Sequence, residues 1–423
     1  MKFNNNKKGI MNIFFNIITA VIIFSCAGGS KSKPDTNEFP QTEILDTLTI
    51  PKDAVPIVYQ GCHIYIVSEV DSISGNFLFD TGADELCFDS IYYANNPFRK
   101  FKFRQAMVSG IGAGGTQSSI VITDTVNFKF KNLDNNLAFI PIMSLKPILG
   151  DFVDGILGKE YFNNQILEIN YFQKYIKLYD NINLINISDY TKINMKKQHN
   201  RFFVPSTIKI NNAVTIQANL LLDIGSGGSI DITSAIANKY KLPSIIVDKI
   251  QYYTKHGGIS GHSVSEYFRA SSVEIGNYKL DDVIMGYSED KSGSLSRSDY
   301  AGLLGNKILE RFDVIIDFMN NDLYLKPNQN YNKLFNFSKL GFAYVDRNAT
   351  MNAWVVTGFD KGSNAEIAGL KIDDKIISVN NIDIHKIPIG EQTDFWERID
   401  KVSLIILRNG IEKRIEFDLK YVL

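Results

Sequence analysis

The sequence predicts a mainly β protein that contains an internal duplication and ends in a separate C-terminal domain. Val, Ile, Thr and aromatic residues are abundant, and long segments with helical periodicity are few. Two pairs of segments repeat each other in the same order, and the composition changes after Pro327. A chain of 423 residues with 44% hydrophobic residues is long enough for two or three domains with their own cores.

The first pair of matching segments places one Asp-x-Gly motif in each copy. Both segments read as an alternating strand, a turn and an apolar strand that runs into the Asp. Both then continue with a small residue, a second alternating strand and a short helix. These segments are residues 64–96, which contain Asp80, and residues 202–240, which contain Asp223.

The second pair follows each Asp motif at nearly the same distance along the chain. Residues 155–179 and 302–326 both begin with Gly, two aliphatic residues and Gly, and continue with a short helix and two strands. Two matched motifs in the same order and at similar spacing indicate two homologous lobes. We expect the lobes to be related by a pseudo-twofold axis.

Such an axis would bring Asp80 and Asp223 together. Asp80 follows the apolar run 77–79, so its buried carboxylate is costly unless it is hydrogen-bonded or shares a proton. Two adjacent carboxylates that share one proton need no cation, because only one of them ionises. Gly82 and Gly225 allow tight turns that point backbone N–H groups at the carboxylates. One Asp could then deprotonate a bound water while the other protonates a carbonyl oxygen.

These residues resemble the retropepsin-like and pepsin-like aspartic peptidases. The matching motifs are Asp80-Thr81-Gly82-Ala83-Asp84, Ile156-Leu157-Gly158 and Leu303-Leu304-Gly305. The resemblance covers residues 46–328 and implies acid-protease-like β-barrel lobes at 46–185 and 190–328. It implies a hydrolase, an aspartic-type endopeptidase with Asp80 and Asp223 as catalytic residues. Its substrates would be extended peptides or proteins, and it would need no cofactor and no metal.

The second loop departs from the family at Ile224, where the family has Thr or Ser. In the family these hydroxyls hydrogen-bond the opposing loop, so Thr81 can still donate but Ile224 cannot reciprocate. Ser226 places a hydroxyl beside Asp223 that Ala83 does not provide in the first loop. Two alternatives therefore stay open: a catalytically inactive peptide-binding lipoprotein, and a homodimeric peptidase that uses Asp80 only.

Each lobe has a Gly-rich stretch between its two motifs. The first contains Gly110 and Gly112, and the second contains Gly258 and Gly261. The first matches a nucleotide-binding glycine pattern, but an alternating strand follows it where that function needs a helix. We therefore expect hairpin tips, which correspond in the family to flaps that close over the substrate.

The C-terminal residues 336–423 resemble a PDZ domain. The carboxylate-binding loop would be Lys339, Leu340, Gly341 and Phe342, with Lys339 at a position usually taken by Gly. Lys339 would add positive charge to this loop or extend along the surface. The resemblance implies that the domain binds a C-terminal peptide ligand by β-augmentation, as a recruiting or regulatory device. A domain that only packs against the rest of the chain is the alternative.

The N-terminus resembles a bacterial lipoprotein signal. Three lysines precede an apolar run at 11–24 that is short for a membrane span, and Cys26 follows. We expect a signal peptide at 1–25, lipidation of Cys26 and a flexible tether at 26–45. The protein would then be exported and lipid-anchored to a bacterial membrane, with a periplasmic or surface-facing location.

Charge and metal-binding residues limit the remaining functions. A formal net charge of −1 without a basic stripe predicts no nucleic-acid binding. The chain has five His and no metal-ligand spacing, so we expect no metal site. Cys62 and Cys87 are more consistent with small buried side chains than with a disulfide between them, although export permits a disulfide.

Overall fold

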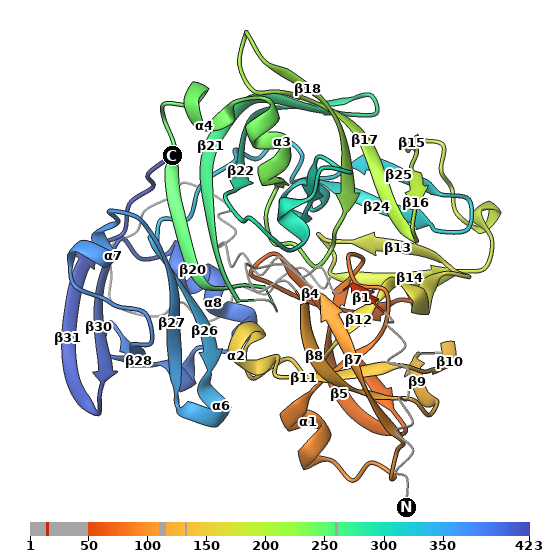
Figure 1. Ribbon diagram of the computed structural model, residues 1–423, viewed down its shortest axis with the longest axis horizontal. Coiled ribbons are helices and arrows are strands. Elements are labelled where there is room, and N and C mark those ends of the chain that lie inside the picture. Colours follow the sequence, from red (N-terminus) through yellow and green to blue (C-terminus); the bar gives the residue numbers. More distant parts are fainter. Residues whose placement is uncertain (1–13, 17–49, 110–115, 132, 259–260) are drawn as a thin grey trace, which may run out of the picture.

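The computed structural model confirms that the chain is mainly β, and the helices among its described residues are short (Figure 1). The residues it describes are 14–16, 50–109, 116–131, 133–258 and 261–423. We refer to residues 55–185 as the first half, residues 190–328 as the second half and residues 340–423 as the C-terminal segment.

One sheet belongs mainly to the first half. Its strand order is β1-β7-β8-β11-β6-β12-β5-β4-β9-β10, and β3 pairs with β4. The strands are β1 (Phe14–Asn16), β3 (Val58–Gln60), β4 (His63–Val70), β5 (Ile73–Asp80), β6 (Cys87–Asp89), β7 (Phe103–Ser109), β8 (Thr116–Ile122), β9 (Val126–Phe130), β10 (Leu133–Leu137), β11 (Ile140–Met143) and β12 (Gly155–Gly158). The short strand β1 comes from the apolar N-terminal run and pairs in parallel with β7.

A second sheet joins the two halves. Its order is β15-β25-β24-β13-β14-β2. The strands β13 and β14 of the first half and β24 and β25 of the second therefore lie side by side in one sheet, where β13 is next to β24. The strands are β2 (Val55–Pro56), β13 (Ile166–Asn170), β14 (Tyr175–Tyr179), β15 (Thr191–Asn194), β24 (Phe312–Asp317) and β25 (Asp322–Pro327). The strands β13 and β24 run antiparallel, with Glu168 opposite Ile315 at the centre of their pairing. The halves are thus joined by a continuous ladder of backbone hydrogen bonds.

The third sheet runs from the second half into the C-terminal segment. Its order is β16-β17-β18-β23-β19-β22-β21-β20-β27-β28-β30-β31. The strands of the second half are β16 (Lys196–Gln198), β17 (Arg201–Lys209), β18 (Thr215–Leu222), β19 (Ile230–Ile232), β20 (Ile250–Gly258), β21 (Gly261–Ile275), β22 (Tyr278–Ser288) and β23 (Gly302–Leu304). Those of the C-terminal segment are β26 (Phe342–Arg347), β27 (Ala353–Asp360), β28 (Lys375–Val379), β29 (Ile382–Asp383), β30 (Lys401–Arg408) and β31 (Ile411–Asp418).

Short helices connect and cover the strands. The α-helices are α1 (Ser90–Asn95), α2 (Lys146–Leu149), α3 (Ser234–Lys239), α4 (Leu242–Ile245), α5 (Asn306–Leu309), α6 (Asn348–Met351), α7 (Asn364–Ile367) and α8 (Gln392–Glu397). The 3-10 turns are η1 (Lys159–Phe162), η2 (Ile182–Leu184), η3 (Ser294–Ser296), η4 (Ile384–Lys386) and η5 (Ile389–Glu391).

The two halves repeat one local arrangement of strands. In the first half, β5 pairs in parallel with β12, and β12 pairs antiparallel with β6. In the second half, β18 pairs in parallel with β23, and β23 pairs antiparallel with β19. The helix that follows begins with a side-chain cap in both cases, because Asp89 caps α1 and Thr233 caps α3. The matching segments of the sequence therefore form matching structure.

The hydrophobic core is continuous across the two halves, and the C-terminal segment has a core of its own. The aliphatic pair Ile156-Leu157 and its counterpart Leu303-Leu304 are fully buried. In the C-terminal core, the rings of Tyr344 and Trp354 stack at 4.7 Å between centroids. Burial of these apolar side chains is the main source of stability for both cores.

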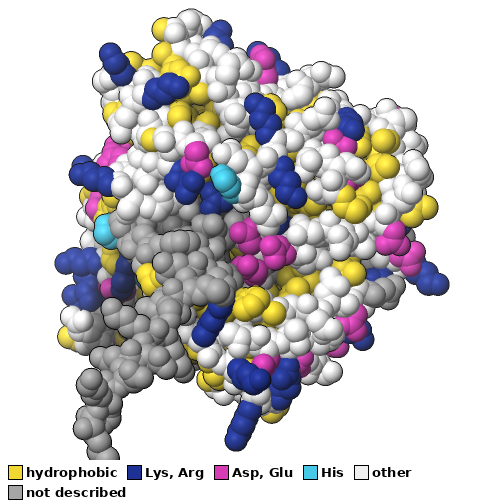
Figure 2. All heavy atoms as spheres, turned by 45° about the vertical axis from the view of Figure 1, so that its right-hand side comes forward, with side chains coloured by type: hydrophobic (Ala, Val, Ile, Leu, Met, Phe, Trp, Pro, Cys, Tyr) yellow, Lys and Arg dark blue, Asp and Glu magenta, His cyan; other side chains and the backbone are white. Residues whose placement is uncertain are grey.

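The surface carries charges of both signs. On the face drawn in Figure 2, Lys and Arg side chains are scattered, while a group of acidic side chains gathers near the middle, beside atoms that are not described. Within the described ranges, no helix is both long enough and apolar enough to span a bilayer.

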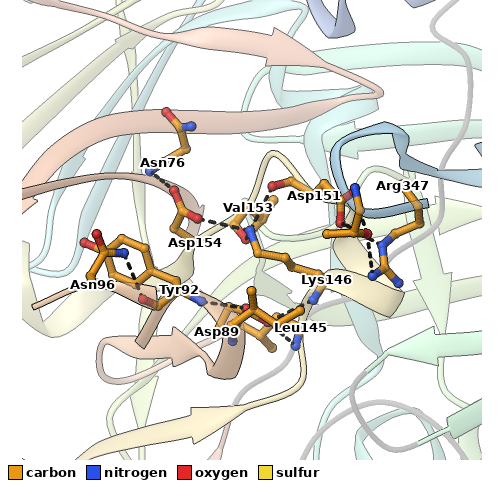
Figure 3. A network of polar contacts seen from close by, with 12 residues as sticks. Asn76, Asp89, Tyr92, Asn96, Leu145, Lys146, Asp151, Val153, Asp154 and Arg347 are labelled. Atoms are coloured by element: carbon orange, nitrogen blue, oxygen red, sulfur yellow. Dashed lines mark hydrogen bonds and ion pairs between the residues drawn. The ribbon is translucent and has the colours of Figure 1, made fainter. Parts of the chain in front are cut away.

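A polar network joins the first half to the C-terminal segment (Figure 3). Lys146 in α2 donates to the carbonyls of Asp151 and Val153 and forms an ion pair with Asp154 at 3.1 Å. The Asp151 N–H donates to the Asp346 carbonyl at 2.7 Å, on the edge of β26 that does not pair with β27. The Asp151 carboxylate pairs with Arg347 at 2.8 Å. The loop after α2 therefore covers part of the β26 edge.

Candidate functional site

The two Asp motifs lie at matching strand ends in the interior. Asp80 is the last residue of β5 and lies opposite Gly158 of β12. Asp223 follows β18, and its N–H donates to the Leu304 carbonyl at 3.0 Å. Both side chains are 0% exposed. The parallel pairing with the aliphatic-Gly strand thus positions each Asp, as the spacing of the motifs predicts.

The second loop lies directly against the Asp80 carboxyl. A Cβ added at Gly225 would come within 2.5 Å of Asp80 Oδ1, which is too close for any side chain. Asp80 Oδ1 also accepts hydrogen bonds from the N–H groups of Gly82 at 2.7 Å and Ala83 at 3.1 Å. Two backbone donors stabilise the ionised form of Asp80.

Asp223 lies in a different electrostatic environment. The polar groups that face its carboxyl are the Asp80 carboxyl and the N–H of Gly225. Neither of its buried carboxyl oxygens completes a hydrogen bond within the described residues. Burial, followed by the negative charge of Asp80, raises the pKa of Asp223 well above its usual range. A proton shared by the pair is therefore favoured on Asp223.

Thr81 links the two loops on one side only. Its Oγ1 donates to the Leu222 carbonyl at 2.8 Å and accepts from the Ile224 N–H at 3.0 Å. Ile224 is fully buried and has no hydroxyl with which to return this contact. The expected cross-loop bond from Thr81 is therefore present, and the expected asymmetry is real. Ser226 is also buried, and its Oγ accepts from the Gly228 N–H at 3.3 Å.

A residue that the sequence did not single out holds the second loop from behind. Asn306 Nδ2 donates to the carbonyls of Ile224 at 2.6 Å and Cys62 at 2.7 Å. Its Oδ1 accepts from the Tyr171 hydroxyl at 2.7 Å. Asn306 thus ties the backbone of the second loop to the first half at Cys62, through bonds that need no hydroxyl on Ile224.

The matching position in the first half is Lys159, which also anchors its loop. Lys159 is 1% exposed, forms an ion pair with Asp84 and donates to the Ala83 carbonyl at 3.4 Å. Asn306 and Lys159 each come directly after the aliphatic-Gly motif. That repeated position is the signal in the sequence by which both residues could have been found.

A third buried carboxyl group, Asp231 in β19, lies close to the pair. Its negative charge contributes to the raised pKa of Asp223. The hydroxyls of Tyr267 and Ser226 face it. Burial raises the pKa of Asp231 itself to about 7.

The strands that flank each Gly-rich stretch pair with each other as a hairpin. The first hairpin is β7–β8, and the strand after its tip excludes the nucleotide-binding arrangement, as expected. Gly110 and Gly112 lie outside the described residues. The second hairpin is β20–β21, where Gly258 lies opposite Gly261.

The loop at Lys339, Leu340, Gly341 and Phe342 is largely occupied by internal contacts. Lys339 is buried, and its Nζ donates to the Glu397 carbonyl at 2.9 Å and pairs with Asp400 at 3.2 Å. The expectation that Lys339 charges the loop or follows the surface is wrong, because the end of α8 binds it. The Leu340 N–H donates to Ser338 Oγ at 3.2 Å. Phe342 is buried and begins β26.

The two cysteines of the described residues, Cys62 and Cys87, differ in their bonding state. Cys87 is a free, buried thiol and Cys62 is disulfide-bonded, so the two are not joined to each other. Cys62 is therefore not the simple buried side chain that we expected.

In the described part of the chain, no cluster of three or more His, Cys, Asp or Glu side chains could hold a metal ion. Cys26 lies outside the described residues, as do the signal and tether regions apart from β1.

No protein-family model matches this chain, and no curated protein matches it in sequence. Its function must therefore be inferred from the geometry of the site.

Proposed function

We propose that this protein is an aspartic endopeptidase whose catalytic pair is Asp80 and Asp223. The observation that carries the proposal is the contact of two buried carboxyl groups at matching strand ends. Gly225 packs against the Asp80 carboxyl, and Asp80 raises the pKa of Asp223. Buried carboxyl groups without a cation are costly, so this arrangement favours a shared proton over a purely structural role.

The different environments of the two carboxyls suggest their roles. Asp80, with two backbone donors, is the base that accepts a proton from a bound water as the water oxygen attacks the peptide carbonyl carbon. Asp223 holds the shared proton and gives it to the carbonyl oxygen. The tetrahedral diol then breaks its C–N bond as Asp80 gives its proton to the leaving nitrogen and Asp223 takes a proton back from a diol hydroxyl, which restores the starting state of the pair.

The repeated strand arrangement supports a two-lobed, retropepsin-like or pepsin-like architecture with lobes at 46–185 and 190–328. The hairpins β7–β8 and β20–β21 would be the flaps over an extended peptide or protein substrate. The buried position of Asp223 beside Asp80 within one chain favours this reading over a homodimer that uses Asp80 only.

We propose that residues 336–423 form a PDZ-like domain with a regulatory role. The β26 edge and the Leu340 N–H would receive a C-terminal peptide, but Asp151 and Ser338 already contact them. Regulation of the peptidase is therefore better supported than free recruitment. Export through a signal peptide, lipidation of Cys26 and anchoring to a bacterial membrane remain part of the proposal from sequence alone.

A catalytically inactive peptide-binding lipoprotein is the second candidate. Ile224 favours it, because the cross-loop hydroxyl contact is present on one side only. The backbone clamp from Asn306 argues against it, because the second loop is held in place without that hydroxyl.

Cleavage of a random peptide library by residues 27–423, from about pH 3 to 8, tests the proposal. Asp80→Asn and Asp223→Asn are compared with wild type and with Asp281→Asn, whose carboxylate is exposed on β22. Loss of cleavage in Asp80→Asn and Asp223→Asn, with cleavage kept in Asp281→Asn, supports the two-Asp site. Loss only in Asp80→Asn favours the homodimer, and an inactive wild type that binds peptides favours the binding protein.

A further inference from the structure

Asp231 introduces an acid where the first half has a thiol. Asp231 lies opposite Leu303 of β23, just as Cys87 lies opposite Ile156 of β12. The two positions are therefore equivalent in the repeated strand arrangement. Asp231 is 2% exposed, and both of its neighbouring strands, β22 and β23, are themselves inside the sheet.

Two glycines make room for this carboxyl group. A Cβ at Gly228 would lie 2.7 Å from Asp231 Oδ2, and a Cβ at Gly286 would lie 3.0 Å from Asp231 Oδ1. One glycine belongs to the loop after Asp223 and the other to β22. The backbone on two sides thus accommodates an acid that a side chain at either position would displace.

The carboxyl is held by hydroxyl groups and lacks a full set of partners. The hydroxyls of Ser226 and Tyr267 face it, and Oδ2 completes no hydrogen bond within the described residues. Ser226 belongs to the Asp223 loop, and its N–H donates to the Asp223 carbonyl at 3.1 Å. Asp231 is therefore connected to the catalytic loop both by contact and by charge.

We propose that Asp231 is a positioning residue that keeps the shared proton on the Asp80–Asp223 pair as the solution becomes neutral. This inference rests on the proposed peptidase function. At acidic pH Asp231 is neutral and has little effect on the pair. Once Asp231 ionises, its negative charge makes removal of a second proton from the same region less favourable, so the pair stays singly protonated to higher pH.

The titratable groups around Asp231 are few. Asp223 faces it from the adjoining loop and Tyr267 faces it from β21, while β22 and β23 approach it with Gly286 and Leu303. Tyr267 in turn has Tyr252 and Asp360 as electrostatic neighbours. Asp360 is a matched control, because burial also raises its pKa to about 7 and it is not among the groups that shift the pKa of Asp231 or Asp223.

The pH dependence of kcat/KM for Asp231→Asn tests the inference, because asparagine keeps the shape and removes the charge. We expect wild-type activity on the acidic side and an alkaline limb shifted to lower pH by roughly one unit, because the charge that opposes loss of the shared proton is gone. In Asp360→Asn the alkaline limb should stay where it is in wild type. Equal alkaline limbs in wild type and Asp231→Asn would overturn the inference.

Carbon-13 NMR of protein labelled at the aspartate carboxyl carbons needs no activity. The Asp223 resonance, assigned by its loss in Asp223→Asn, should titrate at lower pH in Asp231→Asn than in wild type. An inactive wild type with this shift would reject the peptidase function and support the coupling. An unchanged Asp223 titration would overturn the coupling. If Asp231→Asn does not fold, Asp231→Ser removes the same charge with a smaller side chain.

Discussion

Tyr253 in β20 lies opposite Phe359 in β27, so a strand of the second hairpin is also a strand of the C-terminal sheet. The Tyr253 hydroxyl donates to Glu366 at 3.0 Å, and Thr254 Oγ1 donates to the Thr357 carbonyl at 3.2 Å. In Figure 1, β20 runs from the second half down beside β27. The position of the proposed second flap therefore depends on the C-terminal segment.

Gly358→Ala should weaken this junction. A Cβ at Gly358 would lie 2.8 Å from both the Tyr253 carbonyl and the Tyr252 hydroxyl, so β20 must move away from β27. We expect amide hydrogen exchange in β20 to become roughly tenfold faster, the equivalent of about 1.4 kcal/mol of lost protection. Hydrogen-exchange mass spectrometry of the 250–258 region measures this. Gly390→Ala is the control, because a Cβ there meets nothing within 4 Å; equal exchange in both variants would contradict the prediction.

Gly225→Ala should slow peptide cleavage by about a hundredfold while the protein stays folded. The added methyl would collide with the Asp80 carboxyl, which must then leave its two backbone donors. A displacement of about 1 Å at a catalytic group costs on the order of a hundredfold in rate. Steady-state kinetics with a library-derived peptide, together with circular dichroism, check this. A folded variant with wild-type kcat would show that the geometry at Asp80 is not catalytic.

Thr81→Ala should destabilise the protein and Thr81→Ser should not. Alanine leaves the buried Ile224 N–H without its acceptor and removes the bond to the Leu222 carbonyl. An unsatisfied buried polar group costs about 1–3 kcal/mol. Urea unfolding of the two variants measures the difference. If both lose the same free energy of unfolding, the methyl group of Thr81 matters and the hydroxyl does not.

The Asp loops were predictable because their signals are local and repeated. The apolar strand before Asp80, the small residues after it and the second copy at Asp223 are all readable in the sequence. The pairing with Gly158 follows from the duplicated aliphatic-Gly motif. Thr81 could be expected to bond across the loops for the same reason.

Asp231 and the β20–β27 junction could not be predicted in the same way. Ile230-Asp231-Ile232 reads as an alternating strand with its Asp toward solvent, but a strand inside a sheet that is covered on both faces has no solvent side. The pairing of β20 with β27 uses backbone groups, which carry no sequence information. The environment of Lys339 was predicted wrongly because its partners, the Glu397 carbonyl and the Asp400 carboxylate, are distant in sequence.

Arg347→Met should separate the first half from the C-terminal segment. The side chains of Arg347 and Asp151 are both buried, and their ion pair lies at the end of the network that reaches the C-terminal segment (Figure 3). Removing one member of a buried pair typically costs about 3–5 kcal/mol, because the other charge is left without its partner. Thr350 still donates to Asp151, so a value near the lower end is expected. A double-mutant cycle with Asp151→Asn by urea unfolding measures the coupling, and strict additivity would contradict it.

Asp360→Asn should flatten the dependence of stability on pH. Burial raises the pKa of Asp360 to about 7 in the folded protein, whereas an unfolded Asp titrates near 3.9. Between these values the folded state holds a proton that the unfolded state has released. The contribution of Asp360 to the free energy of unfolding is therefore highest below about pH 4. It falls by up to about 4 kcal/mol as the pH rises to about 7, and it is constant above that. Asparagine cannot ionise and loses this contribution.

Urea unfolding at about pH 4.5 and about pH 8 measures the slope. Wild type should lose more stability between these values than Asp360→Asn, with Asp281→Asn as an exposed control that follows wild type. Asp231 contributes a fall of the same sign, so some slope should remain in Asp360→Asn. An unchanged slope in Asp360→Asn would mean that its carboxyl is already ionised in the folded protein at neutral pH. The junction with β20, where Asp360 lies opposite Tyr252, would then have to open enough to hydrate that charge.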